Sequence, residues 1–128
     1  MSAGLTENQI SELKHELKTS YRALREEIRQ ELLASDNEQY IDLAGQVHDR
    51  EEESVADLLV DVNLASINRH IHALQAVDAA LLRMSTDEYG LCVYCRSPIG
   101  YERLKVNPAA PRCYECQVNF EHTHLRTP

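Results

Sequence analysis

The four cysteines of the chain are the sequence feature that most restricts its fold. They form two Cys-x-x-Cys pairs, Cys92 with Cys95 and Cys113 with Cys116, and seventeen residues separate the pairs. Two such pairs with a spacer of about 15–20 residues are the recognised pattern of a four-thiolate zinc site. Zinc takes four soft ligands in a tetrahedron, each about 2.3 Å away, so the pairs leave no position for water or substrate. The sequence therefore predicts one structural zinc ion per chain, which stabilises the fold and catalyses nothing.

Three other interpretations of these cysteines fit the sequence less well. Two disulfides would suit an extracellular protein, but the N-terminus has neither the basic segment nor the apolar core of a secretion signal. The reducing cytoplasm is therefore the expected location. A redox Cys-x-x-Cys belongs beside a βαβ pattern, which the sequence lacks, and four unrelated thiols would rarely show this double spacing. His122 and His124 follow closely, but four thiolates already complete the coordination shell.

The composition indicates an acidic, helix-rich protein. The formal net charge is -8 over 128 residues, and tryptophan is absent. A general nucleic-acid-binding surface would be basic, so direct binding to nucleic acid is not predicted. No apolar run approaches the roughly 18 residues of a membrane span, so membrane association is not predicted either.

A long amphipathic helix is predicted at the start of the chain. Thr6 and Gln9 have the spacing of a capping box, and the pattern continues without Gly or Pro to a polar break at residues 35–37. We expect a helix of about 28 residues. Its apolar stripe, in steps of three and four, comprises Ile10, Leu13, Leu17, Tyr21, Leu24, Ile28 and Leu32.

A short turn and a second long helix are predicted next. Ser35 is expected to cap the short turn and Gly45 to end it. The second helix is predicted from Arg50 to about Ser85, because apolar residues repeat there in alternating steps of four and three. This seam comprises Val60, Leu64, Ile67, Ile71, Leu74 and Leu81.

Together these elements predict a mainly α fold. Two long helices joined by a moderate loop form an antiparallel, coiled-coil hairpin, and a four-cysteine zinc finger and a short terminal helix follow it. We expect the hairpin at residues 1–87, with an acidic tip near residues 45–54. The finger, the short helix and a tail are expected at residues 88–128. A two-helix hairpin buries little apolar surface alone, so zinc at its base should stabilise it.

An unusual concentration of acidic residues lies at the far end of the predicted hairpin, around the turn and at the start of the second predicted helix. Nine acids occur from Asp36 to Asp61, where Arg50 is the only Lys or Arg. One interpretation is a second capping box, in which Asp49 accepts hydrogen bonds from the first amides of the helix and Glu52 occupies its third position. The other is a negatively charged probe for a basic channel or a bound cation in a partner. Caps of this type are common, so the first interpretation needs no special assumption.

The zinc region resembles the DksA/TraR family of bacterial zinc-finger regulators. The resemblance covers about residues 40–118 well and the first helix only by architecture. It is carried by the segment Tyr89-Gly-Leu-Cys92-x2-Cys95-x3-Ile99-Gly-Tyr-Glu-Arg103-Leu104-x3-Pro108-x4-Cys113-x2-Cys116-Gln117 and by the preceding Asp57-Leu-Leu-Val-Asp-Val-Asn-Leu.

The resemblance implies a protein that binds RNA polymerase without contacting DNA. In the family the tip of the coiled coil enters the polymerase secondary channel and carries the motif D-x-x-D-x-A. The matching positions here are Asp49, Glu52 and Ser54, so the second acid is longer and the small residue has become a hydroxyl. Glycine usually follows the second cysteine, and Arg96 stands there instead.

The resemblance does not extend to the nucleotide alarmone ppGpp. Positions that are basic in alarmone-responsive members correspond to Ala76, Asn107 and Gln117, and only Arg69 is retained. We therefore do not predict ppGpp as a ligand.

Two hypotheses of function follow. The first is a non-enzymatic transcription regulator, monomeric or weakly self-associating, that docks on RNA polymerase through the acidic tip. The second is a zinc-stapled helical adaptor or oligomerisation module without polymerase binding, motivated by the wide apolar stripe of the second helix. An enzyme is not predicted, because a closed zinc shell activates no water and the sequence shows neither a Ser/His/Asp set nor a phosphate-binding glycine loop.

Overall fold

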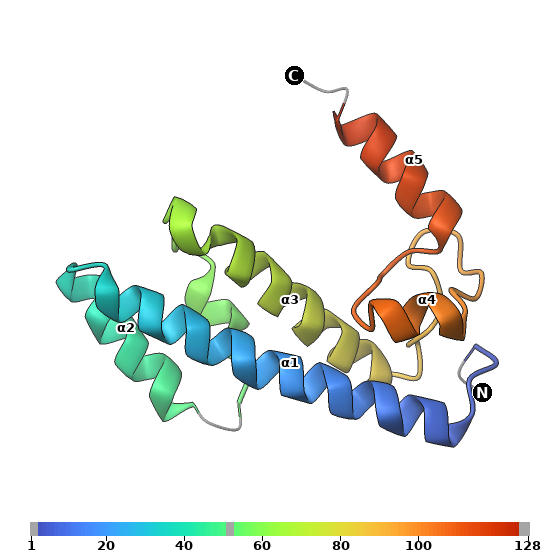
Figure 1. Ribbon diagram of the computed structural model, residues 1–128, viewed down its shortest axis with the longest axis horizontal. Coiled ribbons are helices and arrows are strands. Elements are labelled where there is room, and N and C mark those ends of the chain that lie inside the picture. The colour runs from blue at the N-terminus through green and yellow to red at the C-terminus, as the bar shows by residue number, and fades with distance from the viewer. Residues whose placement is uncertain (1–2, 51–52, 126–128) are drawn as a thin grey trace. The chain divides into compact units, whose positions relative to one another are not determined.

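The computed structural model describes residues 3–50 and 53–125. For residues 123–125 it describes the backbone alone. Over this part of the chain it is helical and has no β-strand, only an isolated bridge between Leu91 and Pro98. No described helix combines the length and apolar character needed to cross a membrane. The elements are α1 (Glu7–Ala34), α2 (Glu38–Asp49), the 3-10 turn η1 (Ala56–Leu59), α3 (Ala65–Ser85), α4 (Tyr101–Val106) and α5 (Tyr114–Leu125) (Figure 1). The predicted mainly α fold, with its helical hairpin and C-terminal four-cysteine region, is confirmed.

The chain forms two compact units. One comprises residues Lys18–Asp78, and the other combines Met1–Leu17 with Ala79–Pro128. Both α1 and α3 contribute residues to each unit. The predicted division at residue 87 stays a prediction.

The start of α1 is the capping box that the sequence predicted. The Thr6 hydroxyl oxygen accepts from the Gln9 amide at 3.0 Å, and the Gln9 side-chain oxygen accepts from the Thr6 amide at 3.0 Å. This reciprocal pair satisfies two amides that have no partner within the helix. The helix has the expected 28 residues.

The short turn predicted after α1 is a full helix, so two boundary predictions are wrong. Asn37, and not Ser35, is the N-cap of α2: its side-chain oxygen accepts from the amides of Gln39 at 2.8 Å and Tyr40 at 3.4 Å. Gly45 does not end the helix, which continues to Asp49. Ala44 and Val47 of α2 are buried, and this burial offsets the cost of one glycine inside a helix.

The predicted start of the second long helix at Arg50 is also wrong, because α3 begins at Ala65. Between them, Val55 and Leu59, at the N-cap and the last residue of η1, lie in the core, while Val60 of the predicted seam is 68% exposed. Short polar side chains such as Asp57, Asp61 and Asn63 compete for backbone hydrogen bonds and weaken a continuous helix here. The spacing of apolar residues alone could not distinguish an α-helix from an irregular segment, because Val55 and Leu59 are buried here without an α-helix.

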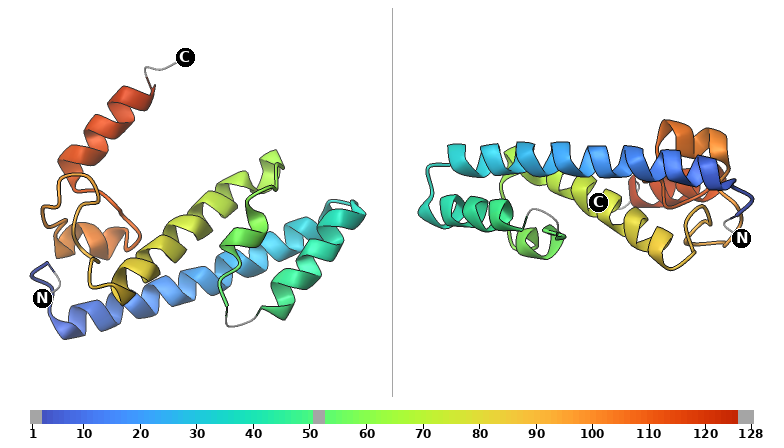
Figure 2. Two further views of the ribbon diagram at one scale, coloured as in Figure 1. Left: turned by 180° about the vertical axis from the view of Figure 1, so that it is seen from behind. Right: turned by 90° about the horizontal axis from the view of Figure 1, so that it is seen from below.

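In the unit of residues 18–78, α1, α2, η1 and α3 share one core. Figure 2 shows α2 beside the C-terminal half of α1 in both views. The buried residues of this core are Ile28, Leu32, Ala44, Val47, Val55, Leu59, Ile67, Ile71 and Leu74. At its edge the two ring nitrogens of His70 face carboxylates of α1: Nδ1 lies 2.6 Å from Glu31, and Nε2 lies 3.1 Å from Glu27.

Substitution of Gly45 tests the corrected length of α2. The residue is in the helix interior with no atom within 4 Å of an added Cβ. Gly45→Ala should therefore raise the free energy of unfolding by about 0.5–1 kcal/mol, measured by chemical denaturation. Gly90→Ala is the matched contrast and should lower it, because Gly90 has φ +91° and the new Cβ would lie 3.0 Å from Ala3 and Leu5 side-chain atoms. A loss of stability in Gly45→Ala would contradict a helix through this position.

Candidate metal centre

The first cysteine pair lies in a tight turn between α3 and α4. The Arg96 amide donates to the Cys92 carbonyl at 3.0 Å, and the Cys92 amide donates to the Ser97 carbonyl at 2.8 Å. Arg96 closes the turn in the left-handed region, with φ +67°. An L-residue adopts that conformation at a cost that glycine does not have. The positive φ at this position explains why a glycine is expected after the second cysteine. Arg96 nevertheless adopts the same turn.

The second cysteine pair lies at the start of α5. Cys113 directly precedes the helix, and its carbonyl accepts from the Gln117 amide at 2.9 Å, so Cys116 lies within the first helical turn. The Val93 amide donates to the Pro111 carbonyl at 2.8 Å and joins the two cysteine-bearing segments through the backbone. The seventeen-residue spacer is thus folded, with α4 inside it and Leu104 fully buried.

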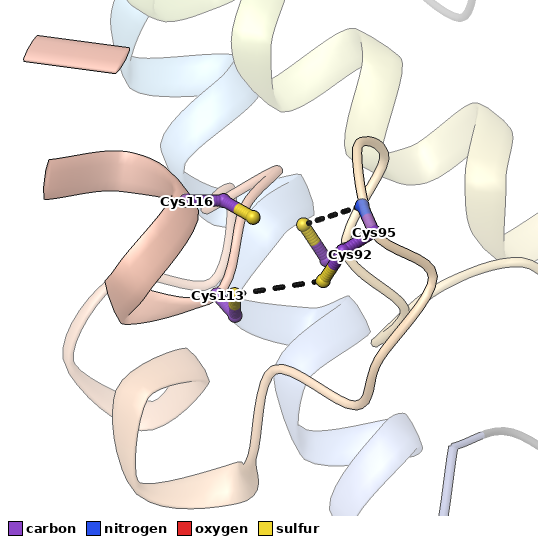
Figure 3. Close-up of side chains that lie close together, drawn as sticks. All are labelled: Cys92, Cys95, Cys113 and Cys116. Carbon is purple, nitrogen blue, oxygen red and sulfur yellow. Dashed lines mark hydrogen bonds between the residues drawn. The ribbon is translucent and has the colours of Figure 1, made fainter. Parts of the chain in front are cut away.

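All four sulfur atoms converge on one point. They lie within 4.8 Å of one another, and they form the single group of metal-binding side chains found among the described residues. Figure 3 shows the four side chains directed toward a common centre. The Cys95 and Cys113 sulfurs are 3.8 Å apart. This equals the edge of about 3.8 Å that follows for a tetrahedron of sulfurs about 2.3 Å from zinc, and far exceeds a disulfide bond of about 2.05 Å.

The electrostatics of the cluster also fit a dication. Burial opposes ionisation of Cys92, but backbone amides, among them those of Cys95 and Tyr94 at 3.4 Å from its sulfur, lower its pKa to about 6. Burial and the neighbouring cysteines instead raise the pKa of Cys116 to about 12. Four thiolates so close together cannot all be charged unless a cation lies between them. A bound zinc ion supplies that charge and holds all four as thiolates.

Residues that carry the sequence resemblance support the two cysteine pairs. The Tyr89 side chain is buried, and its hydroxyl donates to the Pro108 carbonyl at 2.8 Å. Burial raises the Tyr89 pKa to about 12, so this hydroxyl stays protonated as a donor. Arg103 Nε donates to the Arg112 carbonyl at 3.0 Å, directly before Cys113. Both side chains therefore hold the loop that leads into the second pair.

Two interactions of the finger did not stand out in the sequence. The Arg112 guanidinium lies over the Phe120 ring, 3.8 Å from its centroid, and Arg112 Nη1 donates to the Gln117 side chain at 3.4 Å. The spacing of Arg112 and Phe120 is a weak signal, because a cation–π pair depends on where α5 begins. His122 is exposed and outside the sulfur cluster, and the side chain of His124 lies outside the described part.

Of the predicted tip residues, the described ones, Asp49 and Ser54, lie in the other unit, that of residues 18–78. Asp49 is the last residue of α2 and its side chain is 84% exposed. Ser54 is exposed just before η1, and Glu52 lies outside the described residues. The capping box of Asp49 and Glu52 is wrong, because Asp49 ends a helix. The predicted role of the three residues in polymerase contact stays a prediction.

Fold and site together define a small helical protein with a C4-type zinc finger, in which the four cysteines are positioned to bind one zinc ion. Residues 87–122 match the family model of the prokaryotic dksA/traR C4-type zinc finger. The chain is also 30% identical over 60 residues to the RNA polymerase-binding transcription factor DksA of Haemophilus influenzae. That alignment covers 47% of this chain and 41% of the relative.

Two solved structures have a similar fold. The solution structure of the DnaK suppressor protein from Agrobacterium tumefaciens C58 has a TM-score of 0.61 at 23% identity, covering 93% of this chain and 99% of that one. Transcription factor DksA2 from Pseudomonas aeruginosa also has a TM-score of 0.61, at 24% identity, covering 98% of this chain and 93% of that one. Residues 87–122 therefore carry the zinc finger of the dksA/traR family, as the sequence resemblance predicted, and the chain as a whole has a fold similar to that of the two solved structures.

Removal of one cysteine tests the metal centre. Cys92→Ser should lose the zinc ion and destabilise the C-terminal third, because structural zinc contributes about 10–16 kcal/mol of apparent binding energy. Metal analysis of the purified protein and thermal melting measure both effects, and a chelator should reproduce the second. His122→Ala is the control and should keep one zinc per chain. Unchanged metal content in Cys92→Ser would contradict the four-thiolate site.

Removal of the Tyr89 hydroxyl tests the support of the second cysteine pair. Tyr89→Phe leaves the Pro108 carbonyl without this donor, and should lower the free energy of unfolding by about 1 kcal/mol with zinc retained. Tyr94→Phe removes a hydroxyl from a side chain that is 82% exposed and should change nothing measurable. Equal melting of the two variants would show that the hydrogen bond is not stabilising.

Proposed function

We propose that this chain is a non-enzymatic transcription regulator that docks on RNA polymerase, in its secondary channel, through the segment that contains Asp49, Glu52 and Ser54. The carrying observation is the match of its zinc finger to the dksA/traR family, together with a relative named as an RNA polymerase-binding transcription factor. The exposed carboxylate of Asp49 supports an electrostatic contact with a basic surface or a bound cation.

The surface around the proposed contact is acidic. Asp49, Glu53 and Asp57 are exposed there, and the sequence adds Glu51 and Glu52 between them. A nucleic-acid backbone would be repelled by such a surface, which favours a protein partner. The four-thiolate centre leaves no open coordination position, so it supports a structural role for zinc in this protein.

An adaptor or oligomerisation module is the second candidate function. The observation that favours it is Leu82 on α3, which is 64% exposed and which a helix of a partner could cover. Concentration-dependent self-association in light scattering, together with no affinity for polymerase, would favour this candidate.

A pull-down with core RNA polymerase tests the first proposal. The unmodified chain should bind, and the double variant Asp49→Asn with Glu52→Gln should bind much more weakly, because both charges at the proposed contact are removed. The double variant Glu38→Gln with Asp42→Asn removes the same charge elsewhere on α2 and should bind as the unmodified chain does. If both double variants bind equally well, the contact lies elsewhere on the protein. If the unmodified chain does not bind at all, the proposed function is wrong.

A further inference from the structure

Two side chains of α1 bind the chain at the two ends of residues 47–55, which contain the proposed contact residues and are called the acidic segment below. Arg25 Nη2 donates to the Val47 carbonyl at 3.0 Å and to the His48 carbonyl at 3.3 Å, at the end of α2. The Tyr21 hydroxyl accepts from the Val55 amide at 2.7 Å, at the start of η1. Tyr21 and Arg25 are four residues apart and therefore lie on one face of α1. We call these two residues the α1 clasp.

The contact of Arg25 offsets an unfavourable charge at the end of α2. Helix C-termini carry partial negative charge and unpaired carbonyls, so the carboxylate of Asp49 is poorly placed there. The guanidinium of Arg25 supplies both a positive charge and a donor to those carbonyls. Arg50, the C-cap of α2, adds a second positive charge and reaches forward to Asp57 at 3.1 Å.

The contact of Tyr21 satisfies a buried backbone group. Val55 is fully buried, and a buried amide without a partner destabilises a fold. The Val55 amide lies before η1, whose N-cap has no side-chain hydrogen bond. The Tyr21 hydroxyl accepts the hydrogen bond of this amide, so Val55 can be buried without an unsatisfied backbone donor.

The clasp therefore holds the described residues on both sides of the proposed contact, Val47 and Val55, against α1. We propose that Tyr21 and Arg25 are positioning residues for polymerase binding, because they set where Asp49 and Ser54 are presented. This inference rests on the proposed function. Residues that are already held in one position lose less conformational freedom when a partner binds, so loosening the clasp should weaken binding without removing any contacting side chain.

The test uses variants of the 128-residue chain with matched controls. Tyr21→Phe and Arg25→Gln each remove one half of the clasp, and Arg25→Lys restores a positive charge and a donor. Tyr40→Phe removes a hydroxyl that has no hydrogen bond among the described residues, and Arg22→Gln removes an exposed positive charge from α1. Melting and zinc content show that each variant is folded.

Amide hydrogen exchange tests, in the absence of any partner, whether the clasp holds the two ends of the segment. In Tyr21→Phe, exchange of the Val55 amide should accelerate roughly tenfold, the effect of losing about one hydrogen bond from a locally opening segment. In Arg25→Gln, the Arg50 amide, which donates to the Val47 carbonyl, should respond in the same way. The Leu104 amide in the zinc finger should not respond. Unchanged exchange at Val55 and Arg50 overturns the clasp.

Titration with core RNA polymerase then measures the affinity of each variant and so tests the positioning role. Tyr21→Phe and Arg25→Gln should each lower affinity about three- to tenfold, the controls should not, and Arg25→Lys should recover most of the loss. Faster exchange at Val55 and Arg50 with unchanged affinity overturns the positioning role and leaves the proposed function standing. No binding by the unmodified chain overturns the proposed function itself, whereas the exchange data still decide whether the clasp holds the acidic segment.

Discussion

Mutual repulsion among four ionised sulfurs is the constraint on which the C-terminal unit depends. The sulfurs lie within 4.8 Å of one another. Hydrogen bonds from backbone amides lower the pKa of Cys92 to about 6 although its burial opposes this, whereas burial and the neighbouring cysteines raise the pKa of Cys116 to about 12. Only a cation at the centre lets all four carry charge together. The surrounding structure serves this arrangement: Tyr89 and Arg103 hold the backbone on either side of the spacer, and the first turn of α5 places Cys116.

The other unit depends on burial and on a few hydrogen bonds to the backbone. The helix α2 buries Ala44 and Val47 in the core shared with α1 and α3, and Val55, the N-cap of η1, and Leu59, its last residue, add to that core. This packing brings the acidic segment beside Tyr21 and Arg25 of α1, which bind its two ends. The sequence predicted this segment as the turn between two long helices and the start of the second, whereas the structure binds its two ends to α1.

Local signals in the sequence predicted the elements that local physics controls. The capping box of Thr6 and Gln9, the length of α1 and the end of α3 near Ser85 all follow from hydrogen bonds or breaks within a few residues. The prediction at Ser35 was wrong because a neighbouring side chain, Asn37, forms the local cap instead, and those at Gly45 and Arg50 were wrong because they depended on distant packing. Asn37 took the cap, and the apolar residues from Val55 to Leu59 entered the core without forming an α-helix.

The sequence by itself determined the zinc ligands, since the spacing of thiols and the tetrahedral demand of zinc leave one arrangement. It also determined the mainly helical fold and the likeness to the dksA/traR zinc finger. Only the tertiary structure decided where the acidic segment lies and which side chains hold it. The contacts of Tyr21 with Val55 and of Arg25 with Val47 span 34 and 22 residues, and such separations leave no periodic pattern in a sequence.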